Sequence, residues 1–408
     1  MQHTSPIPSA TTEILARRLF EIEESQTLAM ARKSRELKEQ GIEVINLNLG
    51  EPDFPTPDHI KAAAKQAIDD NFSFYPPVSG FLDLRKAICE KLQRENNLHY
   101  SPDQIVVSTG AKQSIANVML SIVNPEDEVL IFSPYWVSYS GLVQLAQGTP
   151  VLIKASLEND YKVTPAQVAA AITPKTKAVI FSSPCNPTGS VFSEGELRAI
   201  AEVLAPYPNI IVIADEIYEH IHFGTKPFSI GAVESLKDRV VTINGMSKGF
   251  AMTGWRLGYA AAPLAIAKAC DKIQGQITSG ANTIAQRAAL AALSSDLAPT
   301  KAMNEAYLRR RDLIKSLLDD IEGLKSNLPE GAFYIFPDVS AFFGKQYKHY
   351  TIQNSEDLCM YLLNEAHLSL VMGEAFGEPN CVRISFAASD AHIIEGMRRL
   401  KAALAQLS

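Results

Sequence analysis

Short apolar runs rich in β-branched residues alternate with helix-length segments over the middle of this chain, and this pattern restricts the fold more than any other feature. The runs lie at 105–108, 129–132, 151–153, 178–181, 210–214, 240–243 and 257–261. Strands that alternate with helices are joined by crossover connections, which make them mostly parallel and cover both faces of their sheet. Residues 51–297 are therefore predicted to form one large α/β domain on a mostly parallel seven-stranded sheet.

A second, smaller domain is predicted after these strands. Pro299 lies between an Ala- and Ser-rich helical stretch at 281–297 and a charged one at 304–321, which indicates a boundary near residue 298. Further elements are expected at 333–336, 381–386 and 390–407. Their strand–strand–helix order is of the α+β type. The 408 residues, at roughly 150 per domain, agree with two or three domains.

Two of the helices between the strands carry clear signals. Residues 112–123 contain neither Gly nor Pro. Residues 194–204 follow Ser193, an N-cap residue with Glu196 as its capping-box partner three positions on. Both stretches are predicted to be crossover helices.

The net charge, the length of the apolar stretches and the spacing of the cysteines indicate which kinds of partner this protein binds. The 38 Lys and Arg against 45 Asp and Glu give a formal charge of −7, which argues against binding nucleic acid or an anionic membrane. The longest strongly apolar stretches are strand-sized, far below the roughly 18 residues of a membrane span, and no signal-peptide pattern is seen. The five cysteines form neither a CxxC pair nor a zinc knuckle. We expect a cytoplasmic protein that acts on small molecules.

The first strand runs directly into a helix through Ser108-Thr109-Gly110-Ala111-Lys112. Unpaired N–H groups and the positive end of the helix dipole bind anions at such a place. A lysine in the first turn opposes the dipole by roughly 0.3–1 kcal/mol unless an anion lies nearby. These residues predict a phosphate site, with a tight turn and an exposed lysine as the alternative.

Asn186, Asp215 and Tyr218 also follow strand ends, where ligands bind in open α/β sheets. Asn186 lies in a loop made rigid by two prolines. Asp215 ends an apolar strand, so its carboxylate is partly desolvated and needs a cation or several hydrogen bonds. A proline-fixed turn and a helix cap are the structural alternatives for these residues.

Lys248 follows the strand at 240–243 in surroundings that suit a nucleophilic amine. Its neighbours are small or apolar, with no acid within six positions. Such surroundings lower an amine pKa from about 10.4 towards neutrality, and a neutral lysine forms Schiff bases. Gly245 to Gly249 also match the G-x-S-x-G elbow of serine hydrolases, but Gly254 and a new strand follow at once and no suitable Asp and His come later. A Schiff-base lysine is therefore favoured.

A metal site is not expected. His220 and His222, with Glu216 and Glu219 nearby, suggest a cluster, but no third ligand is spaced along the sequence to complete it. Neither a P-loop nor a G-x-G-x-x-G motif occurs.

Taken in order, these motifs resemble those of the class I and II aminotransferases, which are pyridoxal 5′-phosphate (PLP) enzymes of fold type I. The motifs are Asn186-Pro-Thr-Gly, Asp215-x-x-Tyr218, Ser247-Lys248, Arg256-x-Gly258-Tyr259 and Arg383-x-Ser385. The stretches at 49–54, 75–80, 134–139 and 273–276 are especially similar to bacterial-type aspartate aminotransferases. The likeness runs from about residue 25 to the C-terminus, and it implies that an N-terminal arm, 1–50, joins residues 298–408 in the small domain.

The resemblance implies roles for these residues. Lys248 holds PLP as a Schiff base and then moves a proton between the substrate Cα and the cofactor C4′, while Asp215 keeps the ring nitrogen protonated. The other cofactor contacts implied are Gly110, Ala111, Lys112, Ser247 and Arg256 at the phosphate, Asn186 and Tyr218 at the phenolic oxygen, Trp136 on the ring face and Tyr75 from a second subunit. The substrate contacts implied are Gly50, Trp136, Asn186 and Arg383. A planar arginine fork suits the α-carboxylate.

The implied reaction is a ping-pong transfer of an amino group from an L-amino acid, with aspartate the expected donor and 2-oxoglutarate the acceptor, in a homodimer. Alanine, aromatic amino acids and glutamate with prephenate stay open as substrates, as does a fold type I lyase or decarboxylase. Two residues depart from the family pattern. Gly245 stands where a phosphate-binding serine is common, with Ser247 nearby. Glu23 or Glu24 stands where a basic residue linked to dicarboxylate recognition is expected.

Overall fold

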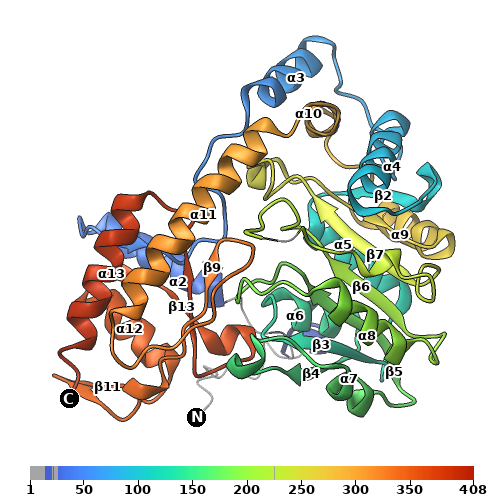
Figure 1. The fold of residues 1–408 in the computed structure, drawn as a ribbon. Coiled ribbons are helices and arrows are strands. Elements are labelled where there is room, and N and C mark those ends of the chain that lie inside the picture. Colours follow the sequence, from blue (N-terminus) through green and yellow to red (C-terminus); the bar gives the residue numbers. More distant parts are fainter. Residues whose placement is uncertain (1–13, 21, 23–25, 225) are drawn as a thin grey trace.

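A seven-stranded sheet forms the centre of the larger part of the molecule (Figure 1). The structure is a computed structural model that describes residues 14–20, 22, 26–224 and 226–408. The strands lie in the order β2 (Ile105–Ser108), β8 (Gly258–Ala261), β7 (Val240–Gly245), β6 (Ile211–Asp215), β5 (Thr176–Ser182), β3 (Glu128–Ser133) and β4 (Thr149–Lys154). β8 runs antiparallel to both of its neighbours, β2 and β7, and the other adjacent strands of this sheet are parallel. The predicted mostly parallel sheet is confirmed, and each strand matches its predicted run to within two residues at either end.

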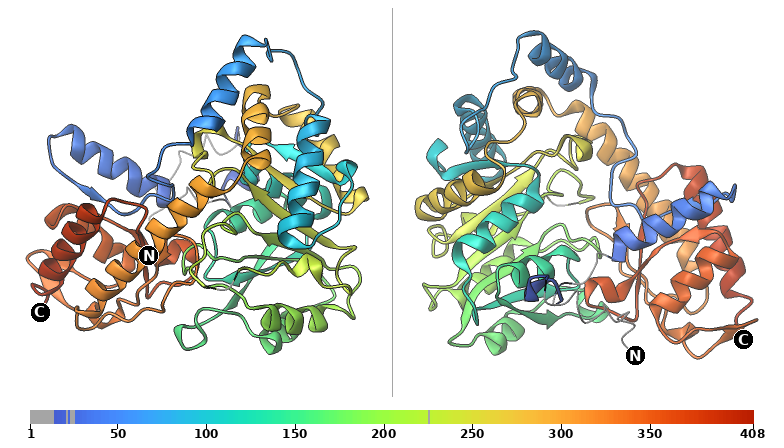
Figure 2. Two further views of the ribbon diagram at one scale, coloured as in Figure 1. Left: turned by 45° about the horizontal axis from the view of Figure 1, so that its top comes forward. Right: turned by 180° about the vertical axis from the view of Figure 1, so that it is seen from behind.

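Helices cover both faces of this sheet, as crossover connections require (Figures 1 and 2). One face bears α5 (Ala111–Ile122), α6 (Ser138–Leu145) and α9 (Leu264–Ile277). The other face bears α4 (Leu82–Asn96), α10 (Thr283–Ser294), α7 (Pro165–Ala171) and α8 (Glu194–Leu204), and α3 (Asp58–Asp69) packs on α10. Successive strand residues point to opposite faces, so Val106 and Val107 belong to different cores.

The sequence signals predict the limits of some helices correctly and of others incorrectly. α8 has the predicted limits. Its start is fixed by the capping box, because Ser193 Oγ accepts from Glu196 N at 3.3 Å and Glu196 Oε2 accepts from Ser193 N at 2.7 Å. The predicted helices at 281–297 and 304–321 are wrong in their limits, since α10 ends at Ser294 and α11 (Ala298–Asp319) begins before residue 304. Pro299 lies in the first turn of α11, where a helix needs no amide donor.

A second group of elements lies beside the sheet and contains the helix α2 (Gln26–Glu39) together with the end of the chain (Figure 2). Its strands are the antiparallel set β13 (Val371–Met372), β14 (Val382–Ser385) and β9 (Tyr334–Ile335), the parallel pair β1 (Ile45–Asn46) and β12 (Leu368–Ser369), and the hairpin β10 (Gln346–Tyr347) and β11 (Tyr350–Thr351). Residues of α11, α12 (Ser355–Glu365) and α13 (Asp390–Leu404) share a single core with Leu47 and Ile384.

The pairing of β1 with β12 joins segments from opposite ends of the chain, and α11 leads from α10 into their group (Figure 1). At its start, Thr300 Oγ1 donates to the Gly249 carbonyl at 2.9 Å. The division into 1–50, 51–297 and 298–408 stays a prediction. In the described part of the chain, no helix is long and apolar enough to cross a membrane.

Candidate active site

A cavity of about 350 Å³ lies at the carboxyl edge of the sheet, where β9 and β14 approach it. Eleven predicted site residues line it: Gly50, Ala111, Lys112, Trp136, Asn186, Asp215, Tyr218, Ser247, Lys248, Arg256 and Arg383. They come from segments far apart in the sequence, because parallel strands end at one edge of a sheet. The structure thus brings most of the predicted site together.

Gly110 and Tyr75 lie outside the lining. Gly110 is the N-cap of α5 with φ of +87°, in the left-handed region that favours glycine, and a Cβ there would lie 2.5 Å from Arg256 Nη2. It therefore allows Arg256 to approach the helix terminus. Tyr75 is 94% exposed.

Lys248 reaches the cavity from the turn after β7, and its ammonium donates to the carbonyl of Gly50. Burial and the positive charge of Arg383 lower the pKa of Lys248 to about 8. Desolvation is the cause that the sequence predicts. A pKa this close to neutrality leaves a useful fraction of the amine in its nucleophilic form.

Asp215 is 3% exposed and ends β6 without an ion pair among the described residues. Tyr139 Oη donates to its Oδ2 at 2.7 Å, and Ile217 N donates to its Oδ1 at 3.3 Å. Burial outweighs these bonds and raises the pKa of Asp215 to about 6. The carboxylate would therefore gain from a cationic partner in the cavity. Sequence reasoning missed Tyr139, although it lies three residues after Trp136 in the same predicted motif.

The N-terminus of α5 carries an excess of positive charge. No acid lies in its first turn, and neither Lys112 nor Arg256 forms an ion pair within the described ranges. Burial and the neighbouring Arg256 lower the pKa of Lys112, whose Nζ lies 5.0 Å from the Trp136 ring. A Cβ at Gly258 would overlap the first amide of the helix, so the backbone must stay bare there. This arrangement fits a phosphate.

Arg383 is a buried cation, 2% exposed, with no carboxylate partner in the part of the chain that is described. Nη1 donates to Asn186 Oδ1 at 3.0 Å and Nη2 donates to Asn48 O at 2.7 Å, while Nε has no hydrogen-bond partner. Its guanidinium carbon lies 4.5 Å from the ring centre of Tyr334. A buried guanidinium with an unused donor fits a carboxylate ligand.

Tyr334 is a second cavity residue that the sequence did not reveal. Its hydroxyl lies 2.8 Å from the hydroxyl of Tyr218, so β9 contacts the segment after β6 across the cavity. A Cβ at Gly50 would lie 2.8 Å from Tyr334 Oη, which explains the glycine. A tyrosine inside a short apolar strand gives no sequence signal of such a role.

The two departures from the family pattern have different outcomes. A Cβ at Gly245 would lie 2.8 Å from Gly258 Cα and 2.9 Å from Leu257 O, so β7 leaves no room for a serine there. Ser247 lines the cavity instead. Glu23 and Glu24 lie outside the described residues.

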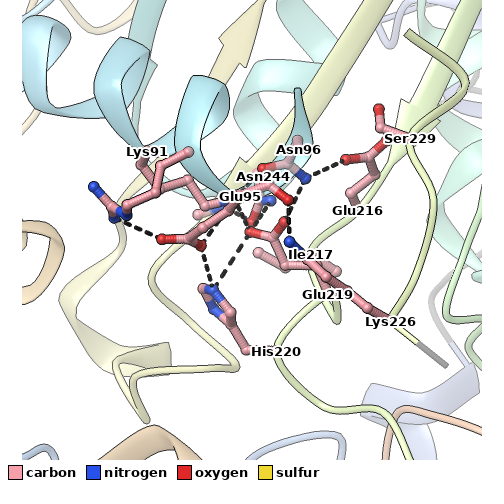
Figure 3. Close-up of polar contacts among 12 residues, drawn as sticks. Lys91, Glu95, Asn96, Glu216, Ile217, Glu219, His220, Lys226, Ser229 and Asn244 are labelled. Carbon is pink, nitrogen blue, oxygen red and sulfur yellow. Dashed lines mark hydrogen bonds and ion pairs between the residues drawn. The ribbon is translucent and has the colours of Figure 1, made fainter. Parts of the chain in front are cut away.

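The structure places a third potential ligand beside His220 and Glu219, one that spacing along the sequence does not reveal. α4 brings Glu95 Oε2 to 2.9 Å from His220 Nε2, and the three residues form one cluster, which does not include His222 (Figure 3). The sequence could not show this, because Glu95 is remote along the chain. The ammonium of Lys91 donates to Glu219 and lies 3.7 Å from Glu95, so a side-chain cation already compensates the carboxylates. We infer no metal site there.

The site offers one group for each part of the ligands that a fold type I PLP enzyme binds. The bare helix terminus with its two cations matches the phosphate, and the buried acid matches the ring nitrogen. The desolvated lysine matches the aldehyde, and the arginine with its unpaired donor matches the substrate carboxylate. The profile of the family described as aminotransferase class I and II matches residues 42–400. The chain belongs to this family and is an aminotransferase. Its members are PLP enzymes, and the predicted resemblance is confirmed.

The similar proteins are named for related activities. An aspartate/prephenate aminotransferase of Cereibacter sphaeroides is 46% identical over 393 residues, which cover 96% of this chain and 98% of that protein. An aspartate aminotransferase of Rhizobium meliloti is 41% identical over 401 residues, covering 96% and 97%.

Solved structures show the same fold. An aspartate aminotransferase from Rhizobium meliloti superposes with a TM-score of 0.93 at 41% identity, covering 97% of this chain and 99% of the other. The Thermus thermophilus aspartate aminotransferase with maleate gives 0.90 at 38% identity, covering 95% and 99%. The predicted fold type I class is thereby confirmed.

Proposed function

We propose that this aminotransferase transfers the amino group of L-aspartate to 2-oxoglutarate, with PLP held in the cavity around Lys248. One observation carries the proposal: Lys248 shares its cavity with two separate anion-binding groups, the α5 terminus with Lys112 and Arg256, and the unpaired fork of Arg383. With a phosphate bound at one place and an amino-acid carboxylate at the other, Lys248 lies beside the atoms that react. The names of the relatives support aspartate as the donor.

Bound PLP supplies an electron-accepting ring that weakens the Cα–H bond of the amino acid. Asp215 would hold the proton on the ring nitrogen, and this pairing gives its desolvated carboxylate a cation. Asn186 and Tyr218 would bind the phenolic oxygen, and Trp136 would cover the ring face. Ser247 and the backbone of Gly110 and Ala111 would add donors at the phosphate.

The substrate contacts follow from charge and reach. Arg383 would bind the α-carboxylate, with Asn186 and Tyr334 holding the guanidinium in place. Lys248, as a neutral amine, would take the proton from Cα, and its lowered pKa makes that form available near pH 8. Gly50 would keep this wall of the cavity open for the substrate.

A homodimer is part of the proposal. Tyr75 and its neighbour Phe74 are 94% and 81% exposed, and exposed aromatic side chains side by side mark interaction surfaces. We propose that Tyr75 reaches the phosphate end of the partner's cavity.

Prephenate, as a 2-oxo acid substrate with glutamate or aspartate as the donor, is a second candidate, because several relatives carry the double name. Like aspartate, it presents a second carboxylate besides the one next to the reacting carbon. Both candidates therefore predict a preference for dicarboxylates.

Spectroscopy and a donor panel test the proposal. The purified protein should show a visible band that bleaches with an amino acid and returns with a 2-oxo acid, and Lys248→Ala should abolish this cycle. Aspartate should give a higher kcat/KM than alanine or aromatic donors. A donor without a second carboxylate that exceeds both aspartate and glutamate would exclude the proposed specificity. Release of carbon dioxide or ammonia in place of a matched 2-oxo acid would indicate a decarboxylase or lyase.

A further inference from the structure

A buried polar network joins α4 to the segments that carry the reacting groups (Figure 3). Lys91 is 1% exposed, and its ammonium donates to Glu219 and, at 2.8 Å, to Asn96 Oδ1. Glu219 accepts at both oxygens, since Asn96 Nδ2 donates to Oε2 at 2.7 Å and Asn244 Nδ2 donates to Oε1 at 2.7 Å. One carboxylate therefore connects α4, the segment after β6 and the end of β7.

Glu219 lies in sequence between Asp215 and Lys248, and it contacts the strand that leads to Lys248. It follows Tyr218 directly, in the segment that begins with Asp215. Its partner Asn244 lies at the end of β7, just before the turn that carries Lys248. Asn244 Oδ1 accepts from Gly245 N at 2.7 Å, so the same amide that binds Glu219 also fixes the backbone entering this turn.

His220 contacts the other side of the turn. A Cβ at Gly249 would lie 2.7 Å from His220 Nδ1, which means that the ring lies directly against the residue after Lys248. The His220 ring meets Phe250 edge-on at 5.4 Å between centres, and Glu95 holds its Nε2 at 2.9 Å. The residues on both sides of Lys248 are thus held by one short segment.

The charges in the network fix the direction of these bonds. Burial disfavours the ionised form of Glu219, but the charge of Lys91 holds the pKa of this carboxyl below its usual value. Burial also opposes the ionisation of Glu95, yet the hydrogen bond with His220 and the charge of Lys91 lower its pKa to about 2. An ionised Glu219 only accepts, so Asn244 must turn Nδ2 towards it and Oδ1 towards Gly245.

We propose that Glu219, held by Lys91, is a positioning residue for transamination that sets the place of Lys248 through Asn244. The inference rests on the role proposed above for Lys248. Neither Glu219 nor Lys91 lines the cavity, so both act through other residues. A displacement of about 1 Å in a reacting group can cost about 10²-fold in rate, which makes a fixed lysine turn valuable.

Two double variants separate this role from a merely stabilising one. Lys91→Met/Glu219→Gln and Lys91→Met/Glu219→Leu both remove the ion pair without leaving Lys91 or Glu219 as an unpaired buried charge, and Glu95 keeps its ion pair with Arg94 in both variants. Only the glutamine keeps an oxygen for Asn244. We expect the leucine variant to lose about 10²-fold in kcat while its KM for aspartate stays within about threefold, and the glutamine variant to recover most of the loss.

The rate at which the visible band forms when PLP is added to the full-length, cofactor-free protein gives a readout independent of turnover. It should fall about tenfold or more in the leucine variant and recover with glutamine, because the amine of Lys248 must meet the aldehyde in the right place. Equal band-formation rates and equal kcat in the two double variants would overturn the proposal, whatever their melting temperatures.

Two further variants keep the test decisive. Should the leucine variant fail to fold, Asn244→Ala removes the same hydrogen bond from the other side and leaves Lys91 and Glu219 paired, with the same losses expected. Arg239→Met is the matched control, since Arg239 is 8% exposed, lies before β7 at its other end and binds the carbonyls of Leu204 and Ala205. It should lower the melting temperature and leave band formation unchanged. A wild-type protein that never forms the band would contradict the proposed function instead.

Discussion

Replacement of Asp215 by Asn is expected to stabilise the cofactor-free protein while it abolishes transamination. Burial raises the pKa of Asp215 from 3.8 to about 6, although Tyr139 and the amide of Ile217 donate to it. A carboxyl whose pKa is raised by folding contributes stability at pH values below its unfolded pKa, and this contribution is lost as the pH rises through the folded pKa. The ionised Asp215 therefore destabilises the folded protein at neutral pH.

The size of the effect follows from the shift. A pKa raised by about 2 units lowers the free energy of unfolding by roughly 3 kcal/mol between strongly acidic and alkaline pH. Roughly 1–2 kcal/mol of this loss falls between pH 5 and pH 8. Asparagine keeps the shape and both bonds, because Nδ2 donates to the Tyr139 hydroxyl while Oδ1 accepts from Ile217 N. The variant should therefore not lose this stability as the pH rises, and the substitution should leave no new cavity.

Urea unfolding of both full-length proteins at pH 5 and pH 8, at one protein concentration, measures this difference. Between pH 5 and pH 8, the free energy of unfolding should fall by roughly 1–2 kcal/mol more in wild type than in Asp215→Asn. Addition of PLP should stabilise wild type more than the variant, because only the carboxylate pairs with a protonated ring nitrogen. An identical pH dependence in the two proteins would refute the raised pKa, and normal turnover by the variant would refute the role of Asp215.

Three further changes probe the other parts of the site. Arg383→Lys keeps the charge but loses the fork, so kcat/KM should fall by about 10²-fold or more for aspartate and glutamate alike in steady-state assays; a loss for aspartate alone would contradict an α-carboxylate contact. Gly258→Ala places a Cβ on the first amide of α5 and should weaken PLP binding by about tenfold or more in absorbance titrations, whereas Gly254→Ala, with no atom within 4 Å of its Cβ, should not. Tyr75→Phe should weaken PLP binding, and mixing it with Lys248→Ala should restore one wild-type site per dimer; titrations that show no gain on mixing would exclude a site shared between subunits.

The strands and the chemistry at their ends could be predicted because both are local in sequence. An apolar β-branched run marks its own strand, and the next residue, such as Asp215 after β6, then lies at the carboxyl edge. The capping box at Ser193 fixes the start of α8 in the same local way. The limits of α10 and α11 were missed because Pro299 ends a helix or begins one equally well, and only packing decides.

The partners of the site residues could not be predicted, because they come from remote segments. Tyr139 reaches Asp215 from α6, Tyr334 reaches Tyr218 from β9, and Lys91 reaches Glu219 from α4. In the sequence the two tyrosines look like ordinary core aromatics, and Lys91 looks like an exposed helix residue. Only the tertiary arrangement shows the contacts from which roles for these side chains are inferred.

Two groups of buried charged residues in this protein differ in whether the chain itself compensates their charges. In the network of Lys91 and Glu219 the opposite charges are paired and both carboxylate oxygens accept hydrogen bonds, so nothing remains for a ligand to supply. In the cavity, Asp215 is desolvated enough to raise its pKa, Lys248 enough to lower its pKa, and Arg383 keeps an unused donor. Buried charges that the chain leaves uncompensated are costly unless a ligand completes them. The satisfied set is therefore expected to hold the site in place, and the unsatisfied set to bind the cofactor and the substrate.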